Sequence, residues 1–339
     1  MSQKVHPRRA LFGAGEAAPA LPVCDHYAGV EVRMRKSLEL QHELGPVFDV
    51  TLDAEDGAPV GGEREHAALI AELVLGPHNR FGRVGARLPA VDHEAFEAVA
   101  QTIVGRAAGR LAYLMIPKVR GVADLQRAAE TVDTLAREAG HAAPIPLHAL
   151  VETHGALREV HTLAAHPRIE SLSFGLMDFV SEHRGAIPQS AMSVTGQFEH
   201  PLVVRAKLEI AAACHASAKT PSHCVVTEFK HASALQTAAT KAARQFGYTR
   251  MWSIHPSQVR PIVEAFAPTV AELDLAIEIL LAAQAADWAP IRHADTLHDR
   301  ASYRYFWHVI DRAHRTSMAH GAQLPAEIRE AWFGHDAPA

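Results

Sequence analysis

The sequence has few cysteines and no excess of positive charge, and these scarcities exclude several classes of protein. Its 339 residues include only 3 cysteines, Cys24, Cys214 and Cys224, without the Cys-x-x-Cys spacing of a zinc cluster. Lys and Arg number 33 against 38 Asp and Glu, so the chain lacks the basic excess of a general nucleic-acid binder. We therefore expect neither a disulfide framework nor a nucleic-acid partner.

Long apolar runs and targeting signals are also missing. No apolar stretch approaches the roughly 18 residues that suggest a membrane-spanning helix. The first residues, MSQKVHPRRALFGAGEAAP, are too polar for a secretory signal. The 23 histidines are scattered, with no His-x-x-x-His or His-Glu-x-x-His pair that would bind a metal from one helix. These absences predict a cytoplasmic protein with no membrane partner.

What the sequence does contain is a hydrophobic content of 48% and a regular alternation of two patterns. Short β-rich runs recur, and each is followed by a segment with helical spacing. Several of the runs are continuously apolar, as is typical of strands covered on both faces. The eight predicted strands are Arg9–Gly13, Phe48–Asp53, Phe81–Leu88, Leu111–Val119, Ile145–Glu152, Ile169–Phe174, His223–Glu228 and Arg250–His255.

The segments between the strands show one apolar face at helical spacing. Between the third and fourth strands, that face comprises Phe96, Val99, Ala100, Ile103 and Val104. Eight strands with crossover helices in about 260 residues predict an α/β fold, a (β/α)8 TIM barrel. An open doubly wound sheet is the alternative, but no Gly-x-Gly-x-x-Gly motif follows a strand.

The barrel pattern ends near Phe266, which predicts a catalytic barrel over residues 1–266 and a helical extension over 267–339. Thr269 and Glu272 form a capping box that predicts a helix start. The extension either packs on its own barrel or docks on a neighbouring subunit, and both interpretations stay open. Interface packing would suit its aromatic residues, which are Tyr303, Tyr305, Phe306 and Trp307.

Charged and polar residues gather after the predicted strands, at the end of a barrel where enzymes place their reacting groups. These residues are Asp53, Glu55, Asp56, Arg87, Lys118, Glu152, Asp178 and His255, and Gly175 lies in the same run as Asp178. Glu152 and Asp178 close consecutive strands and could reach one point above the barrel mouth. Two carboxylates with no nearby cysteine suit a hard cation, most simply Mg²⁺. The alternative is that each acid caps a helix or pairs with a base.

Arg87 can hold a planar carboxylate through two hydrogen bonds, or place positive charge beside a developing enolate oxygen. It can also form a salt bridge with the acids after the second strand, and the two roles can coexist. The acids Asp53, Glu55 and Asp56 would repel one another when ionised, so we expect them to pair with Arg87 or Lys118 or to hold metal-bound water. Lys118 lacks an apolar pocket that would prepare it for a Schiff base.

Six ordered motifs resemble those of the HpcH/HpaI aldolase and citrate lyase β-subunit (CitE-like) family, from about Arg9 to Phe266. They are Asp53-Ala-Glu55-Asp56-Gly57, Val-Gly-Ala-Arg87-Leu, Pro117-Lys118-Val119, Val151-Glu152-Thr153, Ser173-Phe-Gly175-Leu-Met-Asp178 and Ile254-His255-Pro256-Ser257-Gln258. The resemblance implies a Mg²⁺-dependent barrel lyase that forms homotrimers or homohexamers. It also implies that C-terminal helices complete a neighbour's site.

The resemblance assigns the metal ion to Glu152 and Asp178, and makes Arg87 a substrate-binding and catalytic residue. We assign further catalytic roles to Glu55 and Asp56. The expected substrate-binding residues are Arg87, Asp53, Lys118, Gly175 and His255.

The chain departs from the family pattern in two places. Relatives that cleave acyl-CoA substrates carry a Pro-Gly turn after the first strand, where this chain has Gly13-Ala-Gly15. The segment Pro22–Tyr27 looks like an insertion. The region of the seventh strand, usually acidic, reads Pro221-Ser-His-Cys-Val-Val-Thr-Glu228. Coenzyme A binding is therefore less well supported than the metal site.

The function that these features predict is cleavage or condensation of a β-hydroxyacyl-CoA, such as a citryl-, malyl- or citramalyl-thioester, into a keto acid and an acyl thioester. One alternative is a metal-dependent aldolase that acts on free 4-hydroxy-2-oxo acids. Another is a catalytically silent barrel that binds a metabolite. The general acid and base are unassigned, and Asp299 in the C-terminal segment is one candidate acid.

Overall fold

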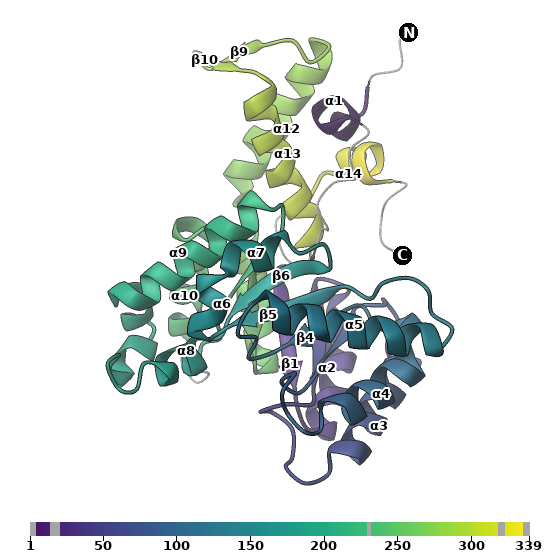
Figure 1. The fold of residues 1–339 in the computed structure, drawn as a ribbon. Helices are drawn as coiled ribbons and strands as arrows, with labels where there is room; N and C mark the ends of the chain where they lie inside the picture. Colours follow the sequence, from purple (N-terminus) through teal and green to yellow (C-terminus); the bar gives the residue numbers. More distant parts are fainter. Residues whose placement is uncertain (1–4, 14–20, 229–231, 318–322, 335–339) are drawn as a thin grey trace. The chain divides into compact units, whose positions relative to one another are not determined.

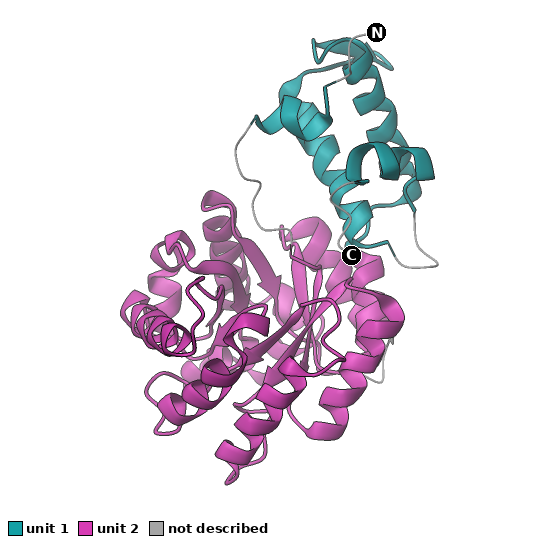
Figure 2. Ribbon diagram, turned by 90° about the vertical axis from the view of Figure 1, so that its right-hand side faces the viewer, with its two compact units in different colours: residues 1–20, 266–339 teal, residues 21–265 magenta. Residues whose placement is uncertain are grey.

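The computed structural model describes residues 5–13, 21–228, 232–317 and 323–334. The chain divides into two compact units, coloured separately in Figure 2. The larger unit covers residues 21–265. The smaller unit joins the described residues before position 21 to those from position 266 onward.

The larger unit is a closed barrel of eight parallel strands in sequence order, with helices around it (Figure 1). This confirms the predicted TIM-barrel fold. The strands are β1 Cys24–Ala28, β2 Phe48–Asp53, β3 Val84–Arg87, β4 Leu114–Ile116, β5 Leu147–Val151, β6 Ile169–Phe174, β7 Thr220–His223 and β8 Arg250–Ser253. Two of them, β2 and β6, have the bounds that the sequence predicted.

The helices of the barrel cover the sheet with their apolar faces. In α4, for example, Val99, Ala100, Ile103 and Val104 are buried at the spacing that the sequence predicted. The helices are α2 Glu31–Leu44, α3 Glu63–Leu75, α4 Phe96–Ala107, α5 Val122–Glu138, α6 His154–Arg158, α7 Val160–Ala165, α8 Leu176–Glu182, α9 Pro201–Ala216, α10 Ala232–Gln245 and α11 Val259–Phe266. Short 3-10 turns are η1 Ala108–Arg110, η2 Gln189–Met192, η3 Gly196–Phe198 and η4 Pro256–Gln258.

The prediction of a first strand at Arg9–Gly13 is wrong. The segment forms a helix, α1 Pro7–Phe12, with His6 as its N-cap and Gly13 at a φ of 69° as its C-cap. Proline at the first helical position and glycine at the end are typical helix boundaries. The first strand is β1, so the apparent insertion Pro22–Tyr27 is part of the barrel wall itself.

The seventh strand was placed too far along the chain. The structure has β7 at Thr220–His223, whereas the sequence predicted His223–Glu228. The apolar run Cys224-Val-Val226 is typical of a buried strand and therefore favours the later position. Pro221 disfavours a strand at the observed position, because proline cannot donate a hydrogen bond to a neighbouring strand. The residues after His223 therefore lie beyond the strand, at the carboxyl end of the barrel.

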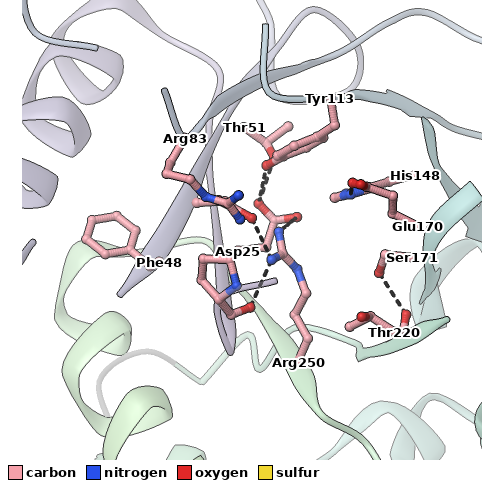
Figure 3. A network of polar contacts seen from close by, with 12 residues as sticks. Asp25, Phe48, Thr51, Arg83, Tyr113, His148, Glu170, Ser171, Thr220 and Arg250 are labelled. Carbon is pink, nitrogen blue, oxygen red and sulfur yellow. Dashed lines mark hydrogen bonds and ion pairs between the residues drawn. The ribbon is translucent and has the colours of Figure 1, made fainter. Parts of the chain in front are cut away.

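The barrel interior near the amino ends of the strands holds a network of buried charges (Figure 3). Arg250 lies between two aspartates, with Nη1 2.6 Å from Asp49 Oδ2 and Nη2 3.1 Å from Asp25 Oδ2, and all three side chains are fully buried. Thr51 and Tyr113 donate hydrogen bonds to Asp25 Oδ1 over 2.7 and 3.0 Å. This network joins strands β1, β2 and β8 with the segment before β4.

Arg250→Met is expected to destabilise the barrel by about 3–5 kcal/mol, because it leaves Asp25 and Asp49 buried without their shared cation. The matched control is Arg205→Met on α9, which breaks an exposed pair with Glu209 and should cost less than about 1 kcal/mol. Urea unfolding of both variants measures the difference. Equal free energies of unfolding for the two variants would contradict the expectation.

The smaller unit has its own hydrophobic core. Its elements are α1, α12 Val270–Ala285, β9 Ile291–His293, β10 Thr296–His298, α13 Arg300–Arg315 and α14 Ala326–Phe333. The predicted capping box of Thr269 and Glu272 begins α12. Among the aromatic residues singled out from the sequence, Tyr303, Phe306 and Trp307 are buried in this core, and Tyr305 is 60% exposed. Packing inside the smaller unit therefore explains why three of these four residues are aromatic, without a contact to a neighbouring subunit.

No helix in the described part of the chain combines the length and the apolar character needed to cross a membrane.

Candidate active site

Asp53 and Arg87 end neighbouring strands and face each other in the β2–β3 register. Arg87 Nε donates to Asp53 Oδ1 over 2.7 Å, and Nη2 donates to Oδ2 over 2.5 Å. Nη1 lies 2.9 Å from Glu55 Oε2. The predicted salt bridge between Arg87 and the acids after strand two is confirmed. Burial lowers the pKa of Arg87, but Asp53 and Glu55 outweigh it and raise that pKa, so the guanidinium stays charged.

The residues after β2 form a tight turn around Asp53. Its carboxylate accepts hydrogen bonds from the backbone N–H groups of Glu55 and Gly57, each over 2.9 Å. A Cβ on Gly57 would lie 2.3 Å from Asp53 Oδ2, and a Cβ on Gly29 would lie 1.8 Å from the Gly57 carbonyl oxygen. The two glycines therefore allow the loops after β1 and β2 to close on a fully bonded carboxylate.

Lys118 follows β4 and supplies the second positive charge. Its Nζ lies 2.5 Å from Glu55 Oε1 and 3.0 Å from Asp56 Oδ2. Burial lowers the pKa of Lys118, but the hydrogen bonds to Glu55 and Asp56 outweigh it and raise that pKa above its ordinary value. A charged amine is no nucleophile, in line with the expectation that Lys118 forms no Schiff base. The acids after β2 are thus paired with Arg87 and Lys118, as predicted.

The backbone of Lys118 also positions Glu152. Lys118 has a φ of 51°, in the left-handed region that residues with a Cβ rarely adopt. In this conformation its backbone N–H donates to Glu152 Oε1 over 2.7 Å. Strain of about 1 kcal/mol or more at such a residue persists where its surroundings enforce it, which is common at active sites.

Glu152 follows β5, is only 2% exposed, and lies against Gly175, which follows β6. Burial and the nearby Asp178 raise the pKa of Glu152 to about 8, although the Lys118 N–H and Arg87 act in the opposite direction. Asp178 is in the first turn of α8, which Gly175 precedes. The structure therefore brings together the two carboxylates that the sequence paired.

Gly175→Ala is expected to displace the Glu152 carboxylate, because a Cβ at position 175 would lie 2.2 Å from Glu152 Oε2. Any ligand that Glu152 holds should then bind at least about tenfold more weakly, as found when the support of a metal ligand is disturbed. The matched control is Gly105→Ala in α4, where a Cβ meets nothing within 4 Å. Calorimetric titration with Mg²⁺ compares them, and equal affinities would show that Gly175 is dispensable.

The donor set of Glu152 and Asp178 fits a hard divalent cation. Within the described residues, no group of three or more His, Cys, Asp or Glu side chains is placed to hold a metal ion. Mg²⁺ does not require such a group, because one or two carboxylates usually hold it while it keeps several waters. A cation between the two carboxylates would also offset the repulsion that raises the Glu152 pKa.

Two other predicted residues have identified structural roles. His255, after β8, is the N-cap of η4, and its Nδ1 accepts a hydrogen bond from the Ser257 backbone. Asp299 is the N-cap of α13, and its carboxylate accepts hydrogen bonds from the backbone of Ala301 and Ser302. Substrate binding by His255 stays a prediction, and so does the acid role of Asp299.

Sequence reasoning missed the aromatic layer beneath the charged residues. Tyr27 stacks on Trp252 with ring centroids 4.5 Å apart, and the Arg87 guanidinium lies 5.4 Å from the Tyr27 centroid. Met115 and Leu150 complete this small cluster. The sequence predicts no role for Tyr27 because its segment resembles an insertion, whereas Tyr27 lies in β1 and contacts the Arg87 guanidinium.

The closed parallel barrel and the acids at its carboxyl end are an arrangement typical of barrel enzymes. The model of the HpcH/HpaI aldolase/citrate lyase family matches residues 50–256, and the chain belongs to that family. The range includes every predicted site residue from Asp53 to His255. The chain is therefore an enzyme, a carbon–carbon lyase.

A solved structure from one bacterium and a lyase from another resemble the chain. A crystal structure of a citrate lyase from Burkholderia xenovorans LB400 is 53% identical, with a TM-score of 0.83, over 96% of this chain and 99% of that one. An L-malyl-CoA/β-methylmalyl-CoA lyase of Cereibacter sphaeroides is 25% identical over 250 residues, which are 70% of this chain and 77% of the relative.

A more distant structure shares the fold. CitE from Mycobacterium tuberculosis, in complex with magnesium, acetoacetate and coenzyme A, is 19% identical, with a TM-score of 0.67. The match covers 87% of this chain and 98% of that one.

Proposed function

We propose that this enzyme is a Mg²⁺-dependent lyase that cleaves, or forms in reverse, a β-hydroxyacyl-CoA such as a citryl-, malyl- or citramalyl-thioester. The observation that carries the proposal is that a buried Glu152 lies near Asp178, and burial together with this second carboxylate raises the Glu152 pKa to about 8. The malyl-CoA lyase relative and the magnesium and coenzyme A bound to CitE support the same chemistry.

Glu152 and Asp178 would hold the ion through carboxylate oxygens, and the ion would supply Lewis-acid polarisation of substrate oxygens. The Lys118 N–H keeps Glu152 oriented over 2.7 Å. Arg87 places a fixed positive charge beside Glu55, where it can stabilise a developing enolate oxygen. Loss of the substrate hydroxyl proton then yields a keto acid and expels the enolate of the acyl thioester.

Glu55 is the residue we propose for proton transfer at the rim. Burial raises the pKa of the Glu55 carboxyl, while Arg87 and Lys118 oppose that shift. A carboxyl group with a pKa above its ordinary value is better matched to acid–base work near neutral pH. Asp56 is exposed and bonded to Lys118, so its proposed role is to hold that amine near Glu55. Asp53, Lys118, Gly175 and His255 would contact or shape the substrate.

A substrate panel tests this proposal. Citryl-, malyl- and citramalyl-CoA are compared with free 4-hydroxy-2-oxo acids, with and without Mg²⁺, and keto-acid release is measured. Turnover of a thioester that stops in EDTA supports the proposal. Turnover of the free acids alone would instead identify a metal-dependent aldolase, and full activity in EDTA would exclude the metal role.

Mg²⁺ affinity is expected to rise with pH up to about 8. The Glu152 pKa is raised to about 8, so below that pH the cation-free site holds a proton that Mg²⁺ must displace. The affinity should therefore increase by up to about tenfold per pH unit and level off once Glu152 is ionised. Calorimetry in buffers of different ionisation enthalpy measures the released proton. An affinity that does not change between about pH 6 and 8 would contradict this.

We also propose a homotrimeric or homohexameric assembly in which the segment 267–339 contacts a neighbouring subunit and the barrel region before it forms the catalytic domain. The exposed Tyr305 is one residue available for such a contact. Light scattering after size-exclusion chromatography gives the subunit number, and a monomer at micromolar concentration would rule the assembly out.

A further inference from the structure

A buried lysine on α9 lies outside the charged rim and has no role in the proposed reaction. Lys207 is fully buried, and no carboxylate pairs with it among the residues that the structure describes. Its Nζ lies 2.7 Å from Gln197 Oε1 and 2.7 Å from His223 Nε2. Phe198 lies against the amine, with its ring centroid 3.9 Å from Nζ. A lysine without a carboxylate is rare in a protein core.

Cys224 reaches the same amide oxygen as the lysine. Its Sγ lies 3.3 Å from Gln197 Oε1, and the thiol also interacts directly with the Lys207 amine. His223 Nδ1 lies 3.1 Å from the Cys224 carbonyl oxygen, so Nδ1 carries the proton and Nε2 accepts from Lys207. The Lys207 nitrogen and the Cys224 sulfur therefore converge on the amide oxygen of Gln197.

We propose that Lys207 and Cys224 form an oxidative N–O–S cross-link, in which one oxygen atom joins the lysine nitrogen to the cysteine sulfur. The oxidant is dioxygen. The thiol and the amine each lose one hydrogen, one oxygen atom becomes the bridge, and the other leaves as water. Nitrogen and sulfur are each oxidised by two electrons, which together reduce one dioxygen molecule.

The surroundings favour this product over the ordinary products of cysteine oxidation. Burial lowers the pKa of Lys207 to about 8 and raises the pKa of the Cys224 thiol, so a fraction of the amine is neutral near neutral pH beside a neutral thiol. Nζ and Sγ already lie 2.7 and 3.3 Å from the same Gln197 oxygen, so both atoms are held on one side of that amide. Cys224 is free in the structure, so its thiol is available to react with the amine.

The bridge would close a loop between α9 and the residue that follows β7. Restricting the unfolded chain in this way stabilises a protein, as a disulfide does. The oxidised enzyme is therefore expected to have a Tm a few degrees higher than the reduced enzyme, and reductant should remove the difference.

Mass spectrometry of the whole enzyme tests the proposal directly. Protein prepared under reductant is transferred to aerated buffer, and its intact mass is followed over days. The expected product has gained one oxygen and lost two hydrogens, and dithiothreitol restores the starting mass. Its tryptic map should show a missed cleavage after Lys207 and a cross-link to the peptide containing Cys224.

Three results would overturn the proposal: an unchanged mass, a gain of oxygen without loss of hydrogen, or a loss of hydrogen alone. Cys224→Ser and Lys207→Met should abolish the mass change and the Tm shift. The matched control is Cys214→Ser, which removes another buried cysteine from α9 and should leave both intact. If the Lys207 variant does not fold, the peptide map of the unmodified sequence still decides.

Discussion

Glu152→Gln and Asp178→Asn are each expected to lower metal-dependent turnover by about a thousandfold or more. Each substitution replaces a charged oxygen ligand by a neutral amide, and a cation that organises a developing negative charge is worth several kcal/mol. Glu152→Gln should fold normally, because burial already raises the Glu152 pKa to about 8 and thus favours its neutral form.

The comparison needs a measurement of binding beside the measurement of rate. Both variants should bind Mg²⁺ more weakly than the parent in calorimetry, while their Tm values stay close to it. Glu130→Gln, on the exposed face of α5, is a control that should retain full activity. Undiminished turnover in either rim variant would refute the assignment of that residue as a metal ligand.

Arg87→Lys is expected to reduce kcat/KM by about 100- to 1000-fold, the usual loss when one well-placed donor to a developing oxyanion is removed. The guanidinium bonds Asp53 through Nε and Nη2 and reaches Glu55 through Nη1. A lysine keeps the charge but has no planar set of donors, so it cannot make these contacts together.

The control for this variant is Arg83→Lys. Arg83 also pairs with an aspartate, with its Nε 2.7 Å from Asp49 Oδ1, but it lies before β3 rather than at its end. Steady-state kinetics should show little change for Arg83→Lys and a large loss for Arg87→Lys, with Mg²⁺ affinity similar in both. Similar kinetics for the two variants would mean that Arg87 serves the fold alone.

Much of the rim could be predicted because a parallel barrel places its strand ends at one edge. Once β2, β5 and β6 are located from their apolar runs, Asp53, Glu152 and Asp178 must gather there. The distances could not be predicted. The approach of Gly175 to Glu152, and the left-handed backbone that turns the Lys118 N–H toward it, depend on how neighbouring loops pack.

The first strand was missed for a physical reason. In β1, Asp25 and Tyr27 fill the interior of the barrel, so the strand has charge where a buried strand is expected to be apolar. Asp25 is tolerated because Arg250 on β8, Thr51 on β2 and Tyr113 just before β4 reach it. Such long-range compensation leaves no local signal in the sequence, and the more apolar segment Arg9–Gly13 was preferred in its place.

The barrel holds two separate groups of charged side chains, one buried near the amino ends of the strands and one at their carboxyl ends. Arg83 and Arg250 balance Asp25 and Asp49, and a layer that includes Tyr27 separates them from the rim. A balanced group of charges projects little field beyond its own diameter. Accordingly, the main causes of the Glu152 pKa shift are burial, Asp178, the Lys118 backbone, Arg87 and Glu55, and they include none of these four network residues. Substitutions in the buried charge network should therefore change the free energy of unfolding while leaving the pKa of Glu152 nearly unchanged.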